Sequence, residues 1–195
     1  NVATNVSTSS TYPSTTEEFN DSLTNAKDGD AIVVSGLITT TNLNASGKNI
    51  TIYGMSEDAT IDASSQTNYI DVSGVTFKNL TVKVASSKDQ FHKTGFINGS
   101  TVFENCKFEG TVTAQLGEYV FNNCVFTNTN EGHYAAFVYA GKATYNNCTF
   151  EGVDRAAKVF NHGDTYDCAA VYNNCTFKAS KVYKTAVEID ATGNV

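Results

Sequence analysis

The sequence predicts an all-β protein: a single-stranded parallel β-helix (solenoid) of about seven coils with an N-terminal capping α-helix. Three observations carry this prediction. A six-residue motif recurs in the second half of the chain, strand-like alternation flanks one asparagine in each repeat, and a short amphipathic segment lies near the N-terminus. Internal similarity with a period of about 20–50 residues is typical of solenoids, in which each repeat forms one coil.

The composition limits the classes of partner. The chain has 195 residues, which fits one domain with a sizeable core. It carries 13 basic and 20 acidic side chains and a single arginine, Arg155, so we expect no binding to nucleic acid. No apolar run approaches the roughly 18 residues of a membrane span. We therefore expect no membrane span, and no motif points to a cofactor.

The N-terminal region divides into a lead-in and a helix. Residues 1–13 are rich in Thr and Ser and predict a flexible lead-in. Residues 14–27 predict the capping helix, because Thr15 and Glu18 have capping-box spacing and Phe19 begins an apolar face. Such a helix would cover the open strand edge of the first coil. Residues 28–195 predict the parallel β-helix itself.

The repeat is aromatic, any residue, Asn, Cys, any residue, Phe. It occurs four times, in 103–108, 121–126, 145–150 and 172–177. Residues 77–82 have the same form with Leu80 in the Cys position, and residues 48–52 fit from Asn49 onward. Successive asparagines are 18 to 30 residues apart, about 25 on average.

The asparagine of each repeat predicts a corner. Apolar positions alternate on both sides of it, but the two runs are out of phase, so the chain must bend there. Asparagine tolerates the left-handed conformation, and its amide can bond to its counterpart in the next coil. We therefore predict one asparagine ladder along the solenoid, formed by Asn49, Asn79, Asn105, Asn123, Asn147 and Asn174.

The cysteines of the repeat predict a column inside the coils, with one thiol per coil about 4.8 Å apart. The column comprises Cys106, Cys124, Cys148 and Cys175. Parallel side chains cannot converge on a zinc ion, nor face each other as a disulfide requires. We therefore expect inert buried thiols and no metal site. Cys168 lies outside the column, and the sequence predicts no role for it.

The corner asparagines, the helix, and the segments Asp28–Val34, Asn49–Gly54 and Ala59–Ala63 together resemble the pectate lyase-like superfamily. The resemblance covers roughly residues 15–193. It implies a right-handed parallel β-helix, the fold in which that superfamily carries the same asparagine ladder. It does not select an activity, because the fold hosts lyases, hydrolases, adhesins and virion fibres.

In that superfamily, catalysis usually occurs on the outward face of one sheet and on the loops beside it. The resemblance therefore implies Lys158, His162, Glu188 and Asp190 as candidate catalytic residues, since they combine bases with carboxylates. The alternative interpretation is a solvated surface of ion pairs across neighbouring strands. Asp71, on the same face, lies roughly 20 Å away along the coils and cannot share a substrate atom with them.

Exposed aromatic and polar side chains suggest sugar binding. Two loops, 86–93 and 127–134, together with the coil that begins near Arg155, supply the candidate ligand-binding residues: Phe91, His92, His133, Tyr134, Arg155 and Asp164. Ordinary loop composition would explain the same residues equally well.

The expected function is a non-catalytic structural or attachment module of a surface-displayed protein, on a bacterial cell or a phage virion. Its expected ligands are cell-surface or host glycans, and its expected location is extracellular, on the cell or virion surface. The alternative is a polysaccharide lyase or glycoside hydrolase. Because residues 181–193 complete a strand without a following asparagine corner, we expect the C-terminal coil to pack against another domain or subunit.

Overall fold

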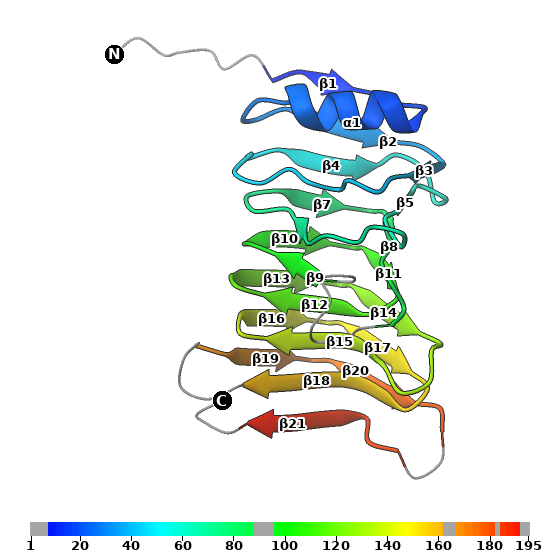
Figure 1. The fold of residues 1–195 in the computed structure, drawn as a ribbon, viewed down its shortest axis with the longest axis vertical. Helices are drawn as coiled ribbons and strands as arrows, with labels where there is room; N and C mark the ends of the chain where they lie inside the picture. Colours follow the sequence, from blue (N-terminus) through cyan, green and yellow to red (C-terminus); the bar gives the residue numbers. More distant parts are fainter. Residues whose placement is uncertain (1–7, 88–95, 162–166, 182–183, 192–195) are drawn as a thin grey trace.

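The computed structural model describes residues 8–87, 96–161, 167–181 and 184–191. It is a right-handed parallel β-helix, whose turns stack along one axis (Figure 1). The predicted fold class is confirmed, with about six coils rather than seven. The difference arises in the first turn, which contributes no strand to one of the three sheets and pairs with it only through an isolated bridge between Asn44 and Asp71.

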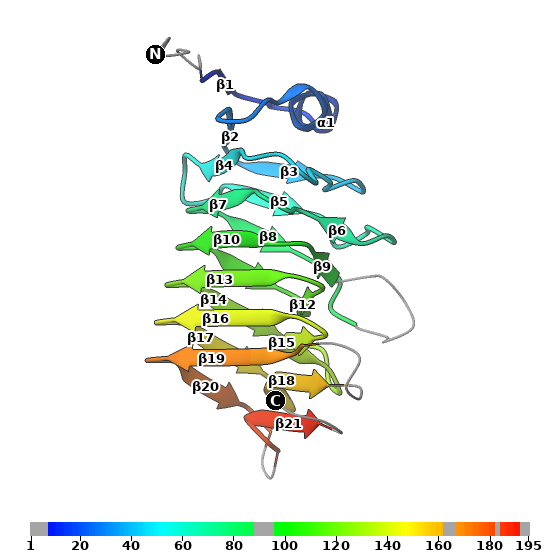
Figure 2. The same ribbon diagram turned by 90° about the vertical axis from the view of Figure 1, so that its left-hand side faces the viewer.

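Three parallel sheets, here called A, B and C, form the walls (Figure 2). Sheet A consists of β1 (Ser10–Thr11), β2 (Ala31–Val34), β4 (Thr51–Gly54), β7 (Thr76–Lys78), β10 (Thr101–Glu104), β13 (Glu118–Asn122), β16 (Lys142–Asn146) and β19 (Ala169–Asn173). Sheet B consists of β3 (Leu37–Thr39), β5 (Thr60–Asp62), β8 (Thr81–Lys83), β11 (Lys107–Glu109), β14 (Val125–Asn128), β17 (Thr149–Gly152) and β20 (Thr176–Ala179). Sheet C consists of β6 (Ile70–Asp71), β9 (Phe96–Asn98), β12 (Val112–Gln115), β15 (Tyr134–Tyr139), β18 (Arg155–Asn161) and β21 (Val187–Ala191).

The helix α1 (Thr16–Asn25) covers the N-terminal end of the stack (Figure 1). Thr15 is its N-cap and accepts a hydrogen bond from the Glu18 amide at 3.2 Å. Phe19 and Leu23 are buried against the first coils, as their spacing predicts. The predicted lead-in is wrong at Ser10 and Thr11, because these residues form β1 and pair with β2. Residues 1–7 lie outside the described residues.

The corner between sheets A and B is built by asparagine. Five of the predicted residues, from Asn79 to Asn174, have φ of 54–55°. Their side-chain amides hydrogen-bond in a continuous series at 2.9–3.3 Å. A second, shorter ladder, which the sequence analysis missed, runs beside it through Asn122, Asn146 and Asn173.

Asn49 does not belong to this ladder. The pairing of β4 with β7 aligns Tyr53 with Lys78. The next residue of each strand is therefore also aligned, which places Gly54 beside Asn79. A Cβ atom on Gly54 would lie 2.1 Å from the Asn79 carbonyl oxygen, and only glycine fits there. The sequence match at residues 48–52 was misleading because Thr51 and Ile52 precede the corner in β4, whereas the match placed them after it.

The interior is filled by columns of like residues, one per coil. Aromatic rings on sheet A stack at centroid separations of 4.9–5.0 Å from Phe77 to Tyr172, and those of sheet B meet them edge-on. The cysteine column is also present: Cys106, Cys124 and Cys148 are buried, Cys175 is partly buried, and all are free thiols. Cys168, for which the sequence predicted no role, is buried with its Sγ 3.4 Å from the Phe160 carbonyl.

Candidate functional site

The outer face of sheet C carries the described residues that the sequence analysis singled out. Alternate residues of its strands point outward, and strand pairing aligns them into two columns. One column contains Phe137, Lys158 and Glu188. The other contains Tyr139, Phe160 and Asp190, while Tyr134 lies opposite Arg155 at the strand starts. We call these eight residues the sheet C patch.

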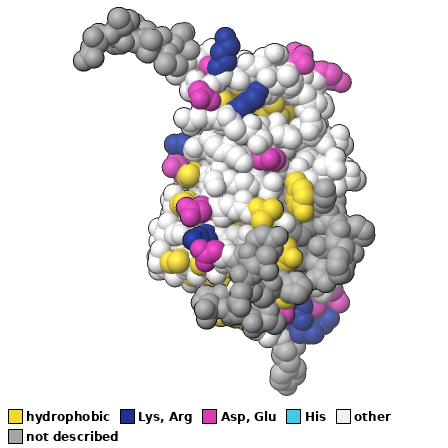
Figure 3. Space-filling view, turned by 60° about the vertical axis from the view of Figure 1, so that its left-hand side comes forward, with side chains coloured by type: hydrophobic (Ala, Val, Ile, Leu, Met, Phe, Trp, Pro, Cys, Tyr) yellow, Lys and Arg dark blue, Asp and Glu magenta, His cyan; other side chains and the backbone are white. Residues whose placement is uncertain are grey.

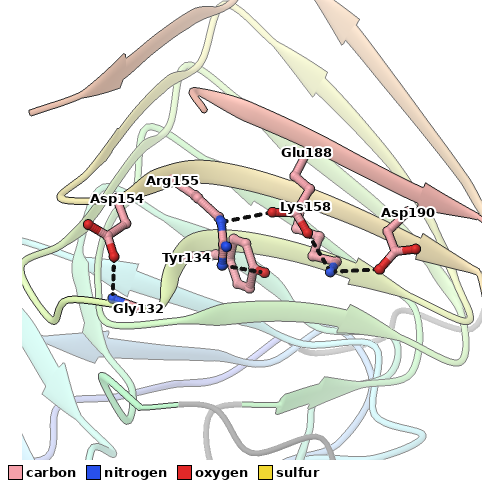
Figure 4. A network of polar contacts seen from close by, with 7 residues as sticks. All are labelled: Gly132, Tyr134, Asp154, Arg155, Lys158, Glu188 and Asp190. Atoms are coloured by element: carbon pink, nitrogen blue, oxygen red, sulfur yellow. Dashed lines mark hydrogen bonds and ion pairs between the residues drawn. The ribbon is translucent and has the colours of Figure 1, made fainter. Parts of the chain in front are cut away.

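Both cations of the sheet C patch are held by carboxylates of the next strand (Figure 4). Lys158 Nζ lies 2.7 Å from Glu188 Oε1 and 3.1 Å from Asp190 Oδ2. Arg155 Nε lies 2.8 Å from Glu188 Oε2, and its Nη1 donates to the Tyr134 hydroxyl at 3.1 Å. The Lys158 side chain is only 12% exposed, so this network is more than a loose surface pairing.

The network fixes the protonation state of Lys158. Burial disfavours the charged ammonium, but the hydrogen bonds to Glu188 and Asp190 outweigh burial and raise the pKa of Lys158. A lysine that acts as a general base must lose its proton near neutral pH, which requires a lowered pKa. Lys158 therefore stays charged near neutral pH, which suits an ion-pair partner of Glu188 and Asp190 better than a general base.

Four aromatic rings lie beside these charges. Tyr134 stacks on Phe137 at 5.6 Å, and Tyr139 stacks on Phe160 at 5.6 Å. Lys158 Nζ lies 5.6 Å from the Tyr134 ring centroid and 5.3 Å from that of Phe160. Such cation–π contacts hold the rings and the cations in one rigid arrangement.

On neighbouring strands of the same face, three oxygens have no hydrogen-bond partner among the residues that the structure describes. Asn98 Oδ1, Thr113 Oγ1 and Gln115 Oε1 are buried, yet none makes a hydrogen bond within the described part of the chain. Strand pairing places Asn98 beside Gln115, and Gln115 in turn beside Tyr139 of the sheet C patch. Native proteins rarely leave buried polar atoms unpaired, so these oxygens need an explanation.

The structure brings together five of the candidates: Lys158, Glu188, Asp190, Arg155 and Tyr134. His133 immediately precedes β15 and is half-buried. Four candidates lie outside the described residues: Phe91, His92, His162 and Asp164. Asp71 lies in β6, at the edge of sheet C opposite β21 and five strands away from it. This agrees with the separation of roughly 20 Å that we expected from the number of coils.

Sequence reasoning missed Phe137, Tyr139 and Phe160. A usable signal was present, because Phe137 and Tyr139 flank the buried Val138 and must share the opposite face of the strand. Asp154, also missed, accepts a hydrogen bond from the Gly132 amide at 2.9 Å and fixes the turn that precedes β15.

On the face drawn in Figure 3, charged side chains of both signs lie in small groups separated by uncharged surface. Among the described residues, no cluster of three or more His, Cys, Asp or Glu could hold a metal ion. No helix in the same residues has the length and apolar character needed to cross a membrane.

Neither known protein families nor curated protein sequences match this chain. Its class is therefore defined by its architecture. The three parallel sheets, the asparagine corners and the N-terminal helix define a right-handed parallel β-helix protein. The fold alone does not assign an activity.

Proposed function

We propose that this chain is a non-catalytic attachment module of a surface-displayed protein and that the sheet C patch binds glycans. The observation that carries the proposal is the juxtaposition of Tyr139 and Phe160 with a neutralised set of charges. Tyr139 and Phe160 are partly exposed, and aromatic rings pack well against the apolar faces of sugar rings. A cell or virion surface is the setting in which such a module would act.

The alternative is a polysaccharide lyase or glycoside hydrolase that uses the same patch. The raised pKa of Lys158 argues against this alternative, since the expected base stays protonated. Both carboxylate oxygens of Glu188 are already engaged, Oε1 by Lys158 and Oε2 by Arg155, so Glu188 is poorly placed to contact a glycosidic oxygen. The geometry therefore favours binding over cleavage.

The test is a glycan-binding screen with purified protein, followed by measurement of affinity for each positive glycan. Tyr139→Ala and Phe160→Ala are expected to weaken binding about tenfold each, because each removes a stacking surface. Tyr12→Ala removes a 66% exposed aromatic ring outside the patch and is the matched control.

The same glycans are then checked for cleavage by the release of reducing ends or unsaturated products. Cleavage that Lys158→Ala abolishes would establish the enzymatic alternative. Full affinity in both aromatic variants would show that the patch is not the binding surface.

We also propose that the last coil packs against another domain or subunit. Ile189 points into the coil interior but is 67% exposed, whereas Val159, one coil earlier in the same column, is 2% exposed. Phe177 and Cys175 are likewise only partly buried, unlike Phe150 one coil earlier. A parallel strand edge with an uncovered core favours association with further strands.

A further inference from the structure

A hollow lies at the corner between sheets A and B, away from the sheet C patch. It has a volume of about 580 Å³, and Tyr53, Met55, Asn79 and Lys107 are among its lining residues. Tyr53 is 37% exposed and Met55 is 59% exposed, so an apolar wall faces solvent. The hollow lies where the main asparagine ladder begins.

The ladder has a vacant position in this hollow. In each later coil, the Nδ2 of the ladder asparagine donates to the Oδ1 of the ladder asparagine in the preceding coil. The first of these bonds runs from Asn105 to Asn79 at 3.0 Å. Asn79 has Gly54 beside it in the preceding coil, and its own Nδ2 makes no hydrogen bond to any residue that the structure describes. No side chain can fill the position from Gly54, because its Cβ would clash with the Asn79 carbonyl.

The free Asn79 amide is also the positive end of an aligned series. Hydrogen-bonded amides that point the same way polarise one another, so the last donor of a chain of five is stronger than an isolated one. The exposed end of the ladder should therefore attract a carbonyl oxygen, and the opposite charges of Lys107 and Glu57 in the same lining offset each other.

We propose that this hollow binds an acetamido sugar, with the acetamido carbonyl accepting from Asn79 Nδ2 as the missing rung of the ladder. The sugar ring then packs on Tyr53, and Met55 adapts to its edge, as flexible thioether side chains do. The inference uses no residue of the sheet C patch and does not depend on glycan binding there.

The test compares N-acetylglucosamine oligomers with glucose oligomers of the same length and linkage, which differ by the acetamido group. We expect the intact chain to bind the acetylated oligomer at least tenfold more tightly, measured by calorimetry. Asn79→Asp keeps the acceptor for Asn105 and tolerates the left-handed backbone, but removes the Nδ2 donor. It should abolish this preference, and Tyr53→Ala should weaken binding about tenfold.

The matched control is Asn44→Asp, the same chemical change at an exposed asparagine outside the hollow, whose Oδ1 accepts from the Ser46 amide; it should leave binding unaltered. Tyr139→Ala, on the sheet C patch, should also leave it unaltered, which separates this site from the proposed function. Equal affinity for the two oligomers, no binding of the acetylated one, or full affinity in both Asn79→Asp and Tyr53→Ala would each overturn the inference. Unfolding curves of each variant confirm that the compared proteins are folded.

Discussion

Asparagine serves two purposes at the corner of each coil: it adopts a left-handed backbone, and it links neighbouring coils through its amide. Asn147, with φ of 54°, donates to Asn123 at 3.3 Å and accepts from Asn174 at 2.9 Å. These two contributions can be separated, because glycine accepts the backbone conformation but supplies no amide.

We predict that Asn147→Ala lowers the free energy of unfolding by about 1 kcal/mol more than Asn147→Gly does. Both variants lose the amide bonds, but alanine adds the strain of a left-handed backbone, about 1–2 kcal/mol. Urea unfolding of the two variants measures the difference. Equal losses would show that backbone strain contributes little at this corner.

The cysteine column shows a different use of a repeated residue. Cys148 Sγ lies 3.4 Å from the carbonyl oxygens of both Asn146 and Phe121, and Cys124 has an equivalent pair of contacts. A thiol is small enough for the narrow interior and is a weak donor to carbonyls at the bend. Burial and these carbonyl contacts support the predicted packing role of the column.

At the scale of elements, one lysine links the C-terminal end of α1 to the coils below it. Lys48, in the loop before β4, donates to the carbonyls of Leu23 and Thr24 near the C-terminus of the helix, the latter at 2.6 Å. A cation at this end of a helix satisfies free carbonyls and interacts favourably with the helix dipole.

We predict that Lys48→Met lowers the free energy of unfolding by about 1–2 kcal/mol, because hydrogen bonds from a charged donor are lost. Lys27→Met is the control, because Lys27 follows the helix but its exposed side chain makes no hydrogen bond or ion pair within the described residues. Thermal unfolding followed by circular dichroism compares the two. A larger loss in the Lys27 variant would contradict the assigned role of Lys48.

The sequence predicted those elements that repeat with an internal period. The strands around the four Cys-containing corners could be predicted from the repeat of aromatic, Asn and Cys residues. Only one register aligns these residues between neighbouring coils, and the strands pair in that register. The first coils were harder, because the corner residue there is Gly54 and a sequence match drew attention to Asn49. β1 was missed because Ser10 and Thr11 carry no apolar pattern, and only backbone pairing defines them.

At the scale of the whole molecule, the candidate site was only partly predictable. The charged residues of the sheet C patch could be identified because Arg155 and Lys158 fall in one repeat, and Glu188 and Asp190 in the next. Their pairing depends on which residues of β18 and β21 are in register, and a variable loop separates these strands. The vacant rung at Asn79 required the register of β4 with β7, which the sequence analysis had placed wrongly.

The stacked interior also sets the response of the whole fold to alkali. Burial raises the pKa of Tyr119, Tyr145 and Tyr172 above the ordinary value of about 10. Well below pH 10 these hydroxyls are protonated in both the folded and the unfolded chain, so they have no effect. As the pH passes 10 the unfolded chain loses protons that the folded chain retains, and the free energy of unfolding falls with a slope that approaches about 1.4 kcal/mol per pH unit for each tyrosine.

We predict that Tyr145→Phe makes this decline shallower by about 1 kcal/mol between pH 10 and 11. The substitution should be tolerated, because Phe103 and Phe121 occupy the same aromatic column in earlier coils. Urea unfolding at pH 8, 10 and 11 gives the slope for both proteins, and loss of lysine charge affects both alike. Parallel declines would mean that Tyr145 ionises without unfolding the stack. A shallower decline would instead show that one buried hydroxyl in the aromatic column limits the stability of every coil around it.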